Sequence, residues 1–299
     1  MKENPLVSVV VVTYNSAQYV IETLESIYNQ SYKNIELIIA DDCSTDDTEV
    51  VCVDWLKKNA GRFINSVFTK TVINSGVSAN LNNGISKSSG EFIKSIAGDD
   101  ILLEDCIATN LRFFHKHPTT EMAFSRCRPF GTNEVLKKSK DVFRYSYFSL
   151  SNRAFKYHIL RSNFVPASTK FTKRSVFDKI GNYDEDIPLL EDWPFLIKAV
   201  CNNVNIKFID VETVRYRIHE SSLSNATVRS ERYMRSEKLA KDFALDYQWR
   251  VSKLLWFNTV ASNKYTNCKN VFAKLFWALL IMINPVTYYL KYTIFKLKK

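Results

Sequence analysis

The sequence lacks a glycine-rich phosphate loop and any paired cysteine motif. Only seven of its 299 residues are glycine, and none forms a Gly-x-Gly-x-x-Gly or Gly-x-x-x-x-Gly-Lys pattern, which argues against a dinucleotide enzyme or a P-loop kinase. The six cysteines include no Cys-x-x-Cys pair and no histidine partner at zinc spacing, and isolated thiols suit a reducing cytosol. The first residues show no signal-peptide pattern. We therefore expect a cytoplasmic protein.

Acidic residues are absent after Asp246, whereas this last part of the chain carries nine cations: Arg250, Lys253, Lys264, Lys269, Lys274, Lys291, Lys296, Lys298 and Lys299. These nearly account for the net charge of +10, so the rest of the chain is close to neutral. A basic tail that is also rich in aromatic residues argues against a nucleic-acid partner. It favours contact with an anionic membrane surface.

An uninterrupted apolar run of membrane-spanning length is also missing. Residues 272–290 are strongly apolar, but Lys274, Asn284 and Pro285 interrupt them. The uncharged core at 275–290 is shorter than the roughly 20 residues that a spanning helix needs. We therefore expect residues 229–299 to form a helical, basic region that lies in the membrane interface, with a span as the alternative. The longest helix of this region is expected at 231–256.

The first 105 residues do contain a regular alternation of strands and helices. Short, predominantly apolar runs at 6–12, 35–40 and 92–97 are typical of parallel strands covered on both faces, and a weaker strand is expected within 62–73. Helices are expected between them, with Ser16 capping the first and Ser44 or Thr45 the second. Four strands alternating with three helices predict a doubly wound α/β half-domain of roughly 100 residues.

Pairs of carboxylates follow two of these strands, at the point where each strand ends. Asp41 and Asp42 follow the second strand, and Asp99 and Asp100 follow the fourth. The carboxyl ends of parallel strands meet at one crevice, so a nucleotide could lie there with its base and ribose near Asp42 and its phosphates on a metal held by Asp99. The alternative is that these acids only cap strands and turns, where aspartate is common.

The pattern is looser after residue 105. We expect a helix at 106–115, strands at 122–127 and 205–210, and a helix from Glu191-Asp192-Trp193 to about residue 201. The segment at 141–166 is expected to be irregular and mixes aromatic with basic residues. Such a mixture would suit an acceptor site, although buried aromatic residues often only anchor a segment to the core.

Several stretches occur together in an order that resembles one enzyme family. They are residues 7–15 and 36–46, Asn74-Ser75-Gly76 with Asn82-Asn83-Gly84-Ile85, Gly98-Asp99-Asp100, and Glu191-Asp192-Trp193. In this order they resemble the motifs of the family 2 glycosyltransferases with the GT-A fold, over roughly residues 5–224. The resemblance implies an α/β fold at 1–228 with a Rossmann-like, mostly parallel sheet flanked by helices. Residues 1–105 would be its nucleotide-binding half, 106–228 its acceptor half, and 229–299 a C-terminal helical extension.

The same resemblance implies which side chains form the site. Those expected to contact the nucleotide, UDP by preference, are Thr13, Tyr14, Asn15, Asp41, Asp42 and Asn74. Those expected to hold Mg²⁺ or Mn²⁺ against its diphosphate are Asp99, Asp100 and His219. Asp192 would be the general base, and further candidate contacts to donor or acceptor are Glu191, Trp193 and Arg217. These roles suit the chemistry, because a departing diphosphate needs its charge neutralised and the attacking hydroxyl must lose a proton.

Two positions depart from the family pattern. The usual Asp-x-Asp is Ala97-Gly98-Asp99 here, and the basic residue that members often carry within 76–82 is missing. These departures keep open a non-catalytic sugar-nucleotide or glycan-binding subunit as the alternative. A nucleotidyltransferase is disfavoured, because residues 13–16 are not a glycine-rich, basic loop.

The expected activity is inverting transfer of a sugar of the hexose type from a UDP-sugar to a hydroxyl of a lipid-linked or cell-surface glycan. Such a step belongs to polysaccharide biosynthesis, and the basic tail would hold the enzyme at the inner face of the membrane. The donor sugar, the linkage and the oligomeric state stay open.

Overall fold

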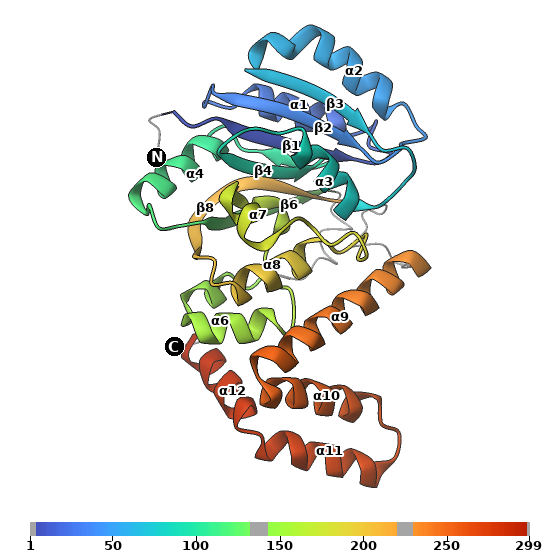
Figure 1. Cartoon of the computed structure of the whole chain (residues 1–299), viewed down its shortest axis with the longest axis vertical. Helices are drawn as coiled ribbons and strands as arrows, with labels where there is room; N and C mark the ends of the chain where they lie inside the picture. Colours follow the sequence, from blue (N-terminus) through green and yellow to red (C-terminus); the bar gives the residue numbers. More distant parts are fainter. Residues whose placement is uncertain (1–3, 132–142, 220–229, 298–299) are drawn as a thin grey trace.

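The computed structural model describes residues 4–131, 143–219 and 230–297. One sheet crosses the upper part of the molecule, and helices extend away from it toward the C-terminus (Figure 1). The strands are β1 (Val7–Thr13), β2 (Ile35–Asp41), β3 (Asn65–Lys70), β4 (Phe92–Ala97), β5 (Ile101–Leu102), β6 (Met122–Gly131), β7 (Phe171–Lys173) and β8 (Ile206–Ile218). The helices are α1 (Val20–Tyr28), α2 (Thr48–Asn59), α3 (Val77–Ser86), α4 (Cys106–Lys116), α6 (Asn152–Ile159), α7 (Ser175–Ile180), α8 (Asp192–Cys201), α9 (Glu231–Val251), α10 (Lys253–Asn267), α11 (Val271–Ile283) and α12 (Pro285–Leu297). The expected boundary at 228/229 lies outside the described residues.

The first half of the sheet is parallel, as the sequence predicts. Its strands lie in the order β3-β2-β1-β4, with Val7 opposite Ile35 on one side and Phe92 on the other. Val9 packs with α1, α2 and α4 in the core on one face, whereas Val10 packs with α3 in the core on the other. Burial on both faces explains why the valine run shows no alternation with polar residues.

The second half of the sheet is mixed, and its long strand β8 returns to the end of β4. The strands continue in the order β7-β6-β8-β5, with β7 antiparallel to β4 and β6 parallel to β8. The register between β6 and β8 shifts on both sides of Arg126, so the strand expected at 205–210 continues to Ile218 as one bulged strand. Antiparallel pairing of Ile101 with Arg215 then holds the far end of β8 beside the acid pair.

Two expected helix caps are wrong. α1 begins at Val20 with no side-chain cap: the Ser16 carbonyl accepts from the Tyr19 and Val20 amides, while the Ser16 hydroxyl contacts the Tyr14 backbone. α2 begins at Thr48, also without a side-chain cap, while the Ser44 hydroxyl donates to Asp41 at 2.5 Å. These hydroxyl residues stabilise contacts between neighbouring strand ends, which a local capping pattern does not reveal.

The segment expected to be irregular contains the helix α6 in its described part. Ser151 caps α6 by accepting a hydrogen bond from the Ala154 amide at 3.4 Å, and Phe155 is buried behind it. Basic residues lie between the apolar residues of α6, so the sequence does not show a clear helical spacing of apolar positions. The rings of Tyr147 and Phe164 lie 4.8 Å apart within the same core, so the aromatic residues anchor the segment to the domain.

The single long helix expected at 231–256 is also wrong. Ser252 adopts an extended conformation, ends α9, and caps α10 by accepting from the Leu255 amide at 3.3 Å. The chain then doubles back, so that α12 lies next to α6 (Figure 1). Its side chains Val286 and Leu290 are buried in the same core as α6.

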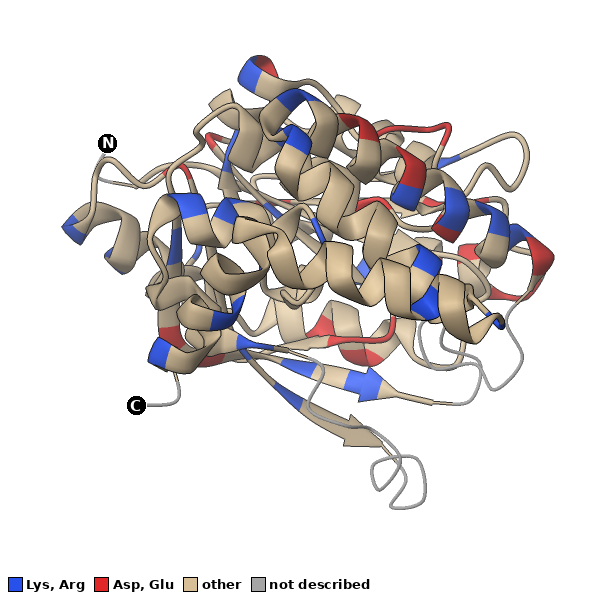
Figure 2. Cartoon of the chain, turned by 90° about the horizontal axis from the view of Figure 1, so that it is seen from below, with Lys and Arg blue, Asp and Glu red and all other residues tan. Residues whose placement is uncertain are grey.

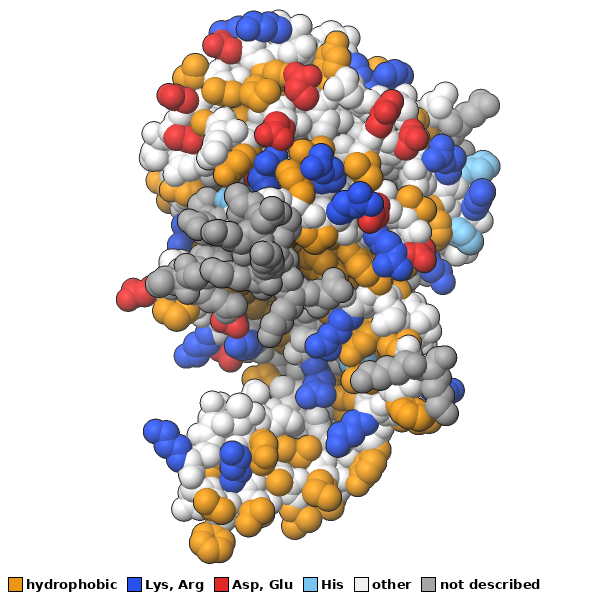
Figure 3. Space-filling model, turned by 180° about the vertical axis from the view of Figure 1, so that it is seen from behind, with side chains coloured by type: hydrophobic (Ala, Val, Ile, Leu, Met, Phe, Trp, Pro, Cys, Tyr) orange, Lys and Arg blue, Asp and Glu red, His pale blue; other side chains and the backbone are white. Residues whose placement is uncertain are grey.

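Helix α11 has no buried side chain, and Figure 3 shows apolar side chains gathered at this end of the molecule. The exposed large apolar side chains of α11 range from 55% exposed for Phe276 to 84% exposed for Phe272. The chain after α9 carries lysines and no acidic residue (Figure 2). Within the described residues, no helix alone has the length and apolarity to cross a membrane, whereas α11 and α12 pass that test only as a pair bent by 68°.

Candidate active site

A cavity of about 790 Å³ lies at the carboxyl ends of β1, β2 and β4. The predicted site residues that line it are Thr13, Tyr14, Asn15, Asp42, Asn74, Asp99, Asp100, Glu191, Asp192 and His219. Asp41, Trp193 and Arg217 are not among its lining residues. The ends of the parallel strands and the loops after them bring seven of these lining residues to one edge of the sheet: Thr13, Tyr14, Asn15, Asp42, Asn74, Asp99 and Asp100. The start of α8 brings Glu191 and Asp192 to the same edge, and the end of β8 brings His219.

Asp41 joins the turns that follow β1 and β2. Its buried carboxylate accepts from the Thr13 hydroxyl at 2.8 Å and from the Ser44 backbone N–H at 2.8 Å. The Ser44 hydroxyl in turn accepts from the Asn15 amide at 2.8 Å. Asn15 has a φ of +50°, in the left-handed region that asparagine tolerates. Asp41 therefore does not line the cavity itself, but its hydrogen bonds hold the lining residues Thr13 and Asn15 in position, the latter through Ser44.

Asp42 fixes the start of α3. One carboxylate oxygen accepts from the Ser75 N–H at 2.8 Å and the other from the Gly76 N–H at 2.7 Å. Gly76 has a φ of +100°, and a Cβ there would lie 2.6 Å from Pro188, so this turn requires glycine. Each carboxylate oxygen can accept more than one hydrogen bond, so Asp42 can still receive a donor from a ligand in the cavity.

Arg232, near the start of α9, reaches the same cavity. Its guanidinium donates to the side-chain oxygen of Asn74 and, at 3.2 Å, to the Asn74 carbonyl. Ser230 and Tyr233 line the cavity beside it. Sequence reasoning missed all three, and no local signal marks Arg232, because its contact with Asn74 joins residues 158 positions apart. α9 thus brings a positive charge to a site that lacks the basic residue expected within 76–82.

Asp99 and His219 form the pair best suited to hold a cation. His219 Nε2 lies 2.9 Å from a carboxylate oxygen of Asp99, and both side chains are partly exposed. Within the described part of the chain, no group of three or more acidic, histidine or cysteine side chains could hold a metal ion. Mg²⁺ is commonly bound through one or two protein ligands together with substrate phosphates, and carboxylates suit both Mg²⁺ and Mn²⁺. The donor set therefore fits either ion as a partner of a bound phosphate.

Asp100 and Arg217 stabilise this corner of the cavity. Asp100 is 1% exposed and accepts from the Arg217 backbone N–H at 2.8 Å. Burial, and after it the charge of Asp99, raise the pKa of the Asp100 carboxyl well above its ordinary value. The Arg217 guanidinium donates to the Asp99 carbonyl at 2.7 Å, pairs with Glu22 at 2.8 Å and lies over the Tyr19 ring. These contacts brace β8 against α1 and the acid pair.

Asp192 and Glu191 bring two further carboxylates to the cavity from the start of α8. Asp192 accepts from the Asn163 side chain at 2.5 Å and from the Trp193 backbone N–H at 2.7 Å. Burial raises the pKa of Asp192, and burial followed by the charge of Asp192 raises the pKa of Glu191 to about 7. Burial also lowers the pKa of nearby Lys170 to about 8. A carboxylate whose pKa lies above its usual range is a better proton acceptor than an ordinary aspartate.

Trp193 anchors α8 to α6. Its indole N–H donates to the Ile159 carbonyl at 2.7 Å, and its ring packs against the core. It therefore fixes the position of the neighbouring Asp192, and the structure shows it making contacts with the protein core.

The cavity thus combines three chemical features within one space. It offers a carboxylate–imidazole pair for a cation, a guanidinium from α9, and a carboxylate with a raised pKa. Such a set can bind an anionic group and accept a proton from a hydroxyl.

The chain is similar in sequence to known glycosyltransferases. The model described as Glycosyl transferase family 2 matches residues 8–181, more than half of the chain. An uncharacterized glycosyltransferase of Methanocaldococcus jannaschii is 25% identical over 279 residues, which cover 92% of this chain and 85% of the relative. The GalNAc(5)-diNAcBac-PP-undecaprenol beta-1,3-glucosyltransferase of Campylobacter jejuni is 37% identical over 105 residues, which cover 35% of this chain and 33% of the relative.

Two solved structures share the fold. The structure of S. aureus TarS 1-349 in complex with UDP-GlcNAc superposes with a TM-score of 0.62 at 19% identity, covering 96% of this chain and 88% of that one. The mannosyltransferase PcManGT of Pyrobaculum calidifontis, in complex with GDP-Man and Mn²⁺, gives a TM-score of 0.57 at 16% identity, covering 94% and 86%. The family match, the relatives and the mixed α/β architecture show that the chain belongs to glycosyl transferase family 2 and is a glycosyltransferase with the GT-A fold.

Proposed function

We propose that the chain transfers a sugar from a nucleotide donor, with UDP preferred, to a hydroxyl of a lipid-linked or cell-surface glycan with inversion at the anomeric carbon. The observation that carries the proposal is that Asp192 and the Asp99–His219 pair line one cavity at the strand ends. The UDP-GlcNAc complex of TarS supports a UDP-sugar donor. The undecaprenol-linked acceptor in the name of the C. jejuni relative supports a lipid-linked acceptor.

Asp192 is proposed as the general base. It would accept the proton of the incoming hydroxyl while the hydroxyl oxygen bonds to the anomeric carbon, and the electrons of the breaking C–O bond would leave with the nucleoside diphosphate. Attack on the side opposite the leaving group inverts the configuration. The bonds from Asn163 and from the Trp193 amide orient the carboxylate, and its raised pKa favours proton acceptance.

The donor end of the cavity is proposed to neutralise the diphosphate. Asp99 and His219 would hold Mg²⁺ or Mn²⁺, which when bound neutralises negative charge on the phosphate oxygens. Arg232 would supply a further positive charge from α9, and Asp42 would accept hydrogen bonds from the base or ribose in addition to those from the Ser75 and Gly76 backbone. Asp100 and Arg217 keep Asp99 in place, and Glu191 lies beside Asp192 as a candidate contact to donor or acceptor.

We also propose that the enzyme is cytoplasmic and peripheral at the inner face of the membrane. The support is the exposed apolar face of α11 together with the lysines that follow α9. Apolar side chains can enter the lipid interface while lysines contact anionic headgroups.

The test is donor turnover by the full chain. The protein is incubated with MnCl₂ or MgCl₂, a membrane lipid extract that supplies lipid-linked glycan acceptors, and each of several UDP-sugars, with GDP-mannose as a second nucleotide class, and released nucleoside diphosphate is measured. We expect UDP release from at least one UDP-sugar and its loss when EDTA is added. Identification of the product by mass would then name the donor sugar.

A non-catalytic binding subunit is the second candidate. Ala97 favours it, because this residue lines the cavity where the usual Asp-x-Asp would supply a carboxylate. Tight UDP binding measured by calorimetry, without release of nucleotide from any donor, would select this candidate and reject catalysis.

A further inference from the structure

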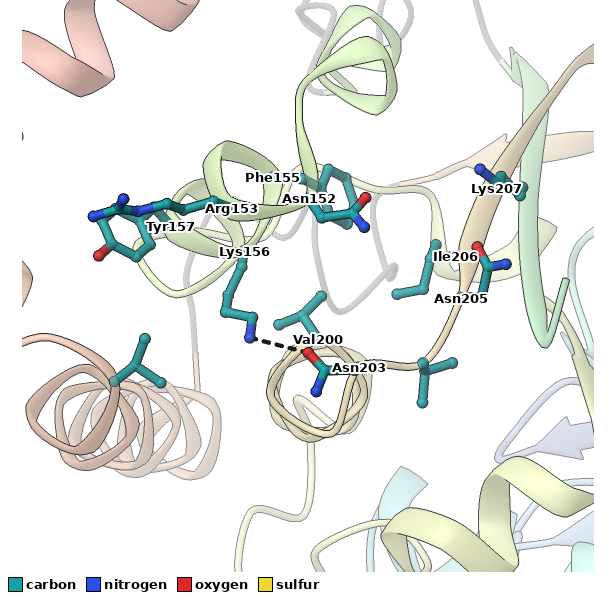
Figure 4. Close-up of a pocket in the computed structure, with 12 residues that line it drawn as sticks. Asn152, Arg153, Phe155, Lys156, Tyr157, Val200, Asn203, Asn205, Ile206 and Lys207 are labelled. Carbon is teal, nitrogen blue, oxygen red and sulfur yellow. Dashed lines mark hydrogen bonds between the residues drawn. The ribbon is translucent and has the colours of Figure 1, made fainter. Parts of the chain in front are cut away.

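Basic side chains in the second half of the sheet domain differ in how deeply they are buried. Arg153, Lys156 and Lys207 line a second cavity, of about 670 Å³, and Figure 4 shows that their side chains point in different directions. Arg153 and Lys207 are exposed, and Lys156 is directed at the Asn203 side chain. Lys170, just before β7, is only 7% exposed. It is a buried cation to which the proposed transfer assigns no role.

The ammonium group of Lys170 lies between two aromatic rings. It donates to the Tyr183 hydroxyl, and it lies 4.6 Å from the centroid of the Tyr183 ring and 4.7 Å from that of the Phe195 ring. Burial raises the pKa of Tyr183, so this partner stays neutral and does not compensate the charge of the lysine. None of the salt bridges among the described residues includes Lys170.

The two rings connect Lys170 to the start of α8. Their centroids lie 4.5 Å apart, and the Phe195 amide donates to the Glu191 carbonyl at 3.3 Å in the first turn of the helix. Tyr183 is held on α3, because the Asn82 side chain donates to its carbonyl and accepts from its amide, each at 3.0 Å. Lys170 therefore packs against the helical turn that begins with the proposed general base.

Glu191 and Asp192 are the acidic groups that act on Lys170. Burial lowers the pKa of Lys170 to about 8, the charges of these two carboxylates oppose this effect, and the buried Lys94 adds to it. Conversely, burial raises the pKa of both carboxyls, and the charge of Lys170 lowers it. Charges interact more strongly in a water-poor site than at a surface. The lysine and the two carboxyls therefore influence one another's ionisation.

This influence bears on the proposed proton transfer. A general base has to be ionised before the hydroxyl arrives. Two adjacent carboxyls in a water-poor site repel each other when both are charged, so the pair retains a proton at a higher pH than isolated carboxyls do. A positive charge that is fixed beside the pair offsets this repulsion.

We propose that Lys170 is a positioning residue for the transfer: its charge keeps Asp192 ionised, and its packing against Tyr183 and Phe195 holds the start of α8 at the cavity. This role rests on the proposed function, in which Asp192 is the base. Lys170 is not among the residues that line the active-site cavity. It therefore acts through Asp192 and not on the substrate.

The first measurement is the pH dependence of kcat/KM for the full chain, with donor and lipid extract, in the unaltered protein and in K170M. Methionine can pack on the same rings but carries no charge. The acidic limb of this profile reports the ionisation of the carboxyl pair as a whole in the free enzyme. We expect the limb of K170M to lie about one pH unit or more higher, the shift expected from one charge a few ångströms away at an effective dielectric constant of about 20.

The matched control is K87M, which removes an exposed lysine after α3. Its acidic limb should coincide with that of the unaltered protein. K170R keeps the positive charge and should restore the position of the limb, whatever its effect on the maximal rate.

The second measurement needs no substrate and compares the urea midpoints of the same proteins between about pH 5.5 and 7.5. The pKa of Glu191 is about 7 in the folded protein, above its ordinary value, so stability falls as the pH rises from the ordinary pKa through that value. In K170M the folded-state pKa would lie higher still, so stability would keep falling where that of the unaltered protein levels off. The stability advantage of the unaltered protein over K170M should therefore grow as the pH rises, whereas its difference from K87M should stay constant.

The opposite results would overturn the assignment. An unmoved acidic limb in K170M, even with a lower rate at every pH, or a stability difference that does not change with pH, would mean that Lys170 only fills space. Where K170M does not fold, Y183F serves in both measurements, because it keeps the ring but removes the hydroxyl that accepts from the ammonium group. It should change both results in the same direction as K170M.

Failure of the proposed transfer would be recognised separately. If no donor is turned over, the proposed function is rejected, and the unfolding measurement alone decides whether the charge of Lys170 is coupled to the carboxyl pair. If turnover is observed and the limb does not move, the transfer stands and the role of Lys170 is rejected.

Discussion

Asp192 is the side chain on which the proposed transfer depends most directly. Replacing it by asparagine keeps the size of the side chain and an acceptor oxygen for Asn163, but removes the proton acceptor. We expect Asp192→Asn to lower kcat by about 10²–10⁴-fold, the usual contribution of a general base. The dissociation constant for UDP should change by less than about twofold, because the lost function concerns proton transfer and not donor binding.

The control for this variant is Asp186→Asn, which alters an exposed carboxylate in the segment that precedes α8. It should keep kcat unchanged. Unchanged turnover in Asp192→Asn, or an equal loss in both variants, would contradict the assignment of Asp192 as the base.

Arg232 tests whether α9 contributes to donor binding. Its guanidinium is held by Asn74 at the edge of the cavity, where it can pair with a phosphate. A hydrogen bond to a charged group contributes about 1.5–3 kcal/mol, so Arg232→Gln should raise KM for the donor on the order of tenfold or more. Steady-state kinetics at varied donor concentration measure this. Arg235→Gln, one turn further along α9 and exposed, should leave KM unchanged, and a similar rise in both variants would remove Arg232 from the site.

Two residues show what the sequence could and could not reveal about the site. Asp99 could be predicted, because it follows a buried strand whose carboxyl end faces the crevice in any fold of this class. Arg232 could not, because its place in the cavity depends on how α9 packs across the finished domain. Local sequence patterns predict where strands end, but they do not predict contacts between residues more than 100 positions apart.

At the scale of elements, Gly84 determines how closely α3 packs on the sheet. A Cβ at this position would lie 2.6 Å from Val10 Cγ1 and 3.1 Å from Ala40 Cβ. In an exposed helix, glycine to alanine would gain about 1 kcal/mol, but overpacking a core typically costs about 1–3 kcal/mol. We therefore expect Gly84→Ala to lower the free energy of unfolding, measured as a lower urea midpoint.

Gly61→Ala is the matched control, because the added Cβ would have no atom within 4 Å apart from those of its own local backbone and chain neighbours. Its urea midpoint should stay the same or rise. A Gly84→Ala midpoint at or above that of the unaltered protein would show that α3 can shift away from β1 without loss.

The elements that the sequence predicts correctly are those buried on two faces. β1, β2 and β4 are rich in apolar residues on both faces because α1 and α3 cover opposite sides of the sheet, and this composition can be read from the local sequence. The break at Ser252 is not predicted, because it depends on the capping hydroxyl of one residue. Helix α6 is not predicted either, because the basic residues between its apolar side chains hide the helical spacing. The bulge at Arg126 is likewise set by the pairing of β6 with β8, which lie far apart in the sequence.

At the scale of the whole molecule, α11 and α12 differ in what they do for the fold. α12 buries Val286 and Leu290, and its Thr293 hydroxyl lies 3.0 Å from His158 Nε2 on α6. α11 buries no side chain. Deleting the whole tail would therefore uncover α6, whereas substitutions on α11 should leave the domain intact. Membrane attachment is best tested on α11 alone.

The expected result is that the unaltered protein sediments with vesicles that contain anionic lipid, and that a variant with three apolar side chains of α11 replaced by serine stays in the supernatant. The three substitutions are Phe272→Ser, Leu275→Ser and Leu279→Ser, at side chains that are 57–84% exposed. Burying one large apolar side chain is worth about 1.5–3 kcal/mol, so removing three should lower the membrane partition coefficient by more than about a hundredfold. The matched control replaces three exposed apolar residues of the sheet domain by serine, Val50, Ile64 and Val72, and should sediment as the unaltered protein does. Because lysines contribute through screened charge, raising the salt concentration should weaken binding only in part. Recovery of the unaltered protein in the supernatant, or sedimentation of the α11 variant, would show that this face meets something other than a membrane.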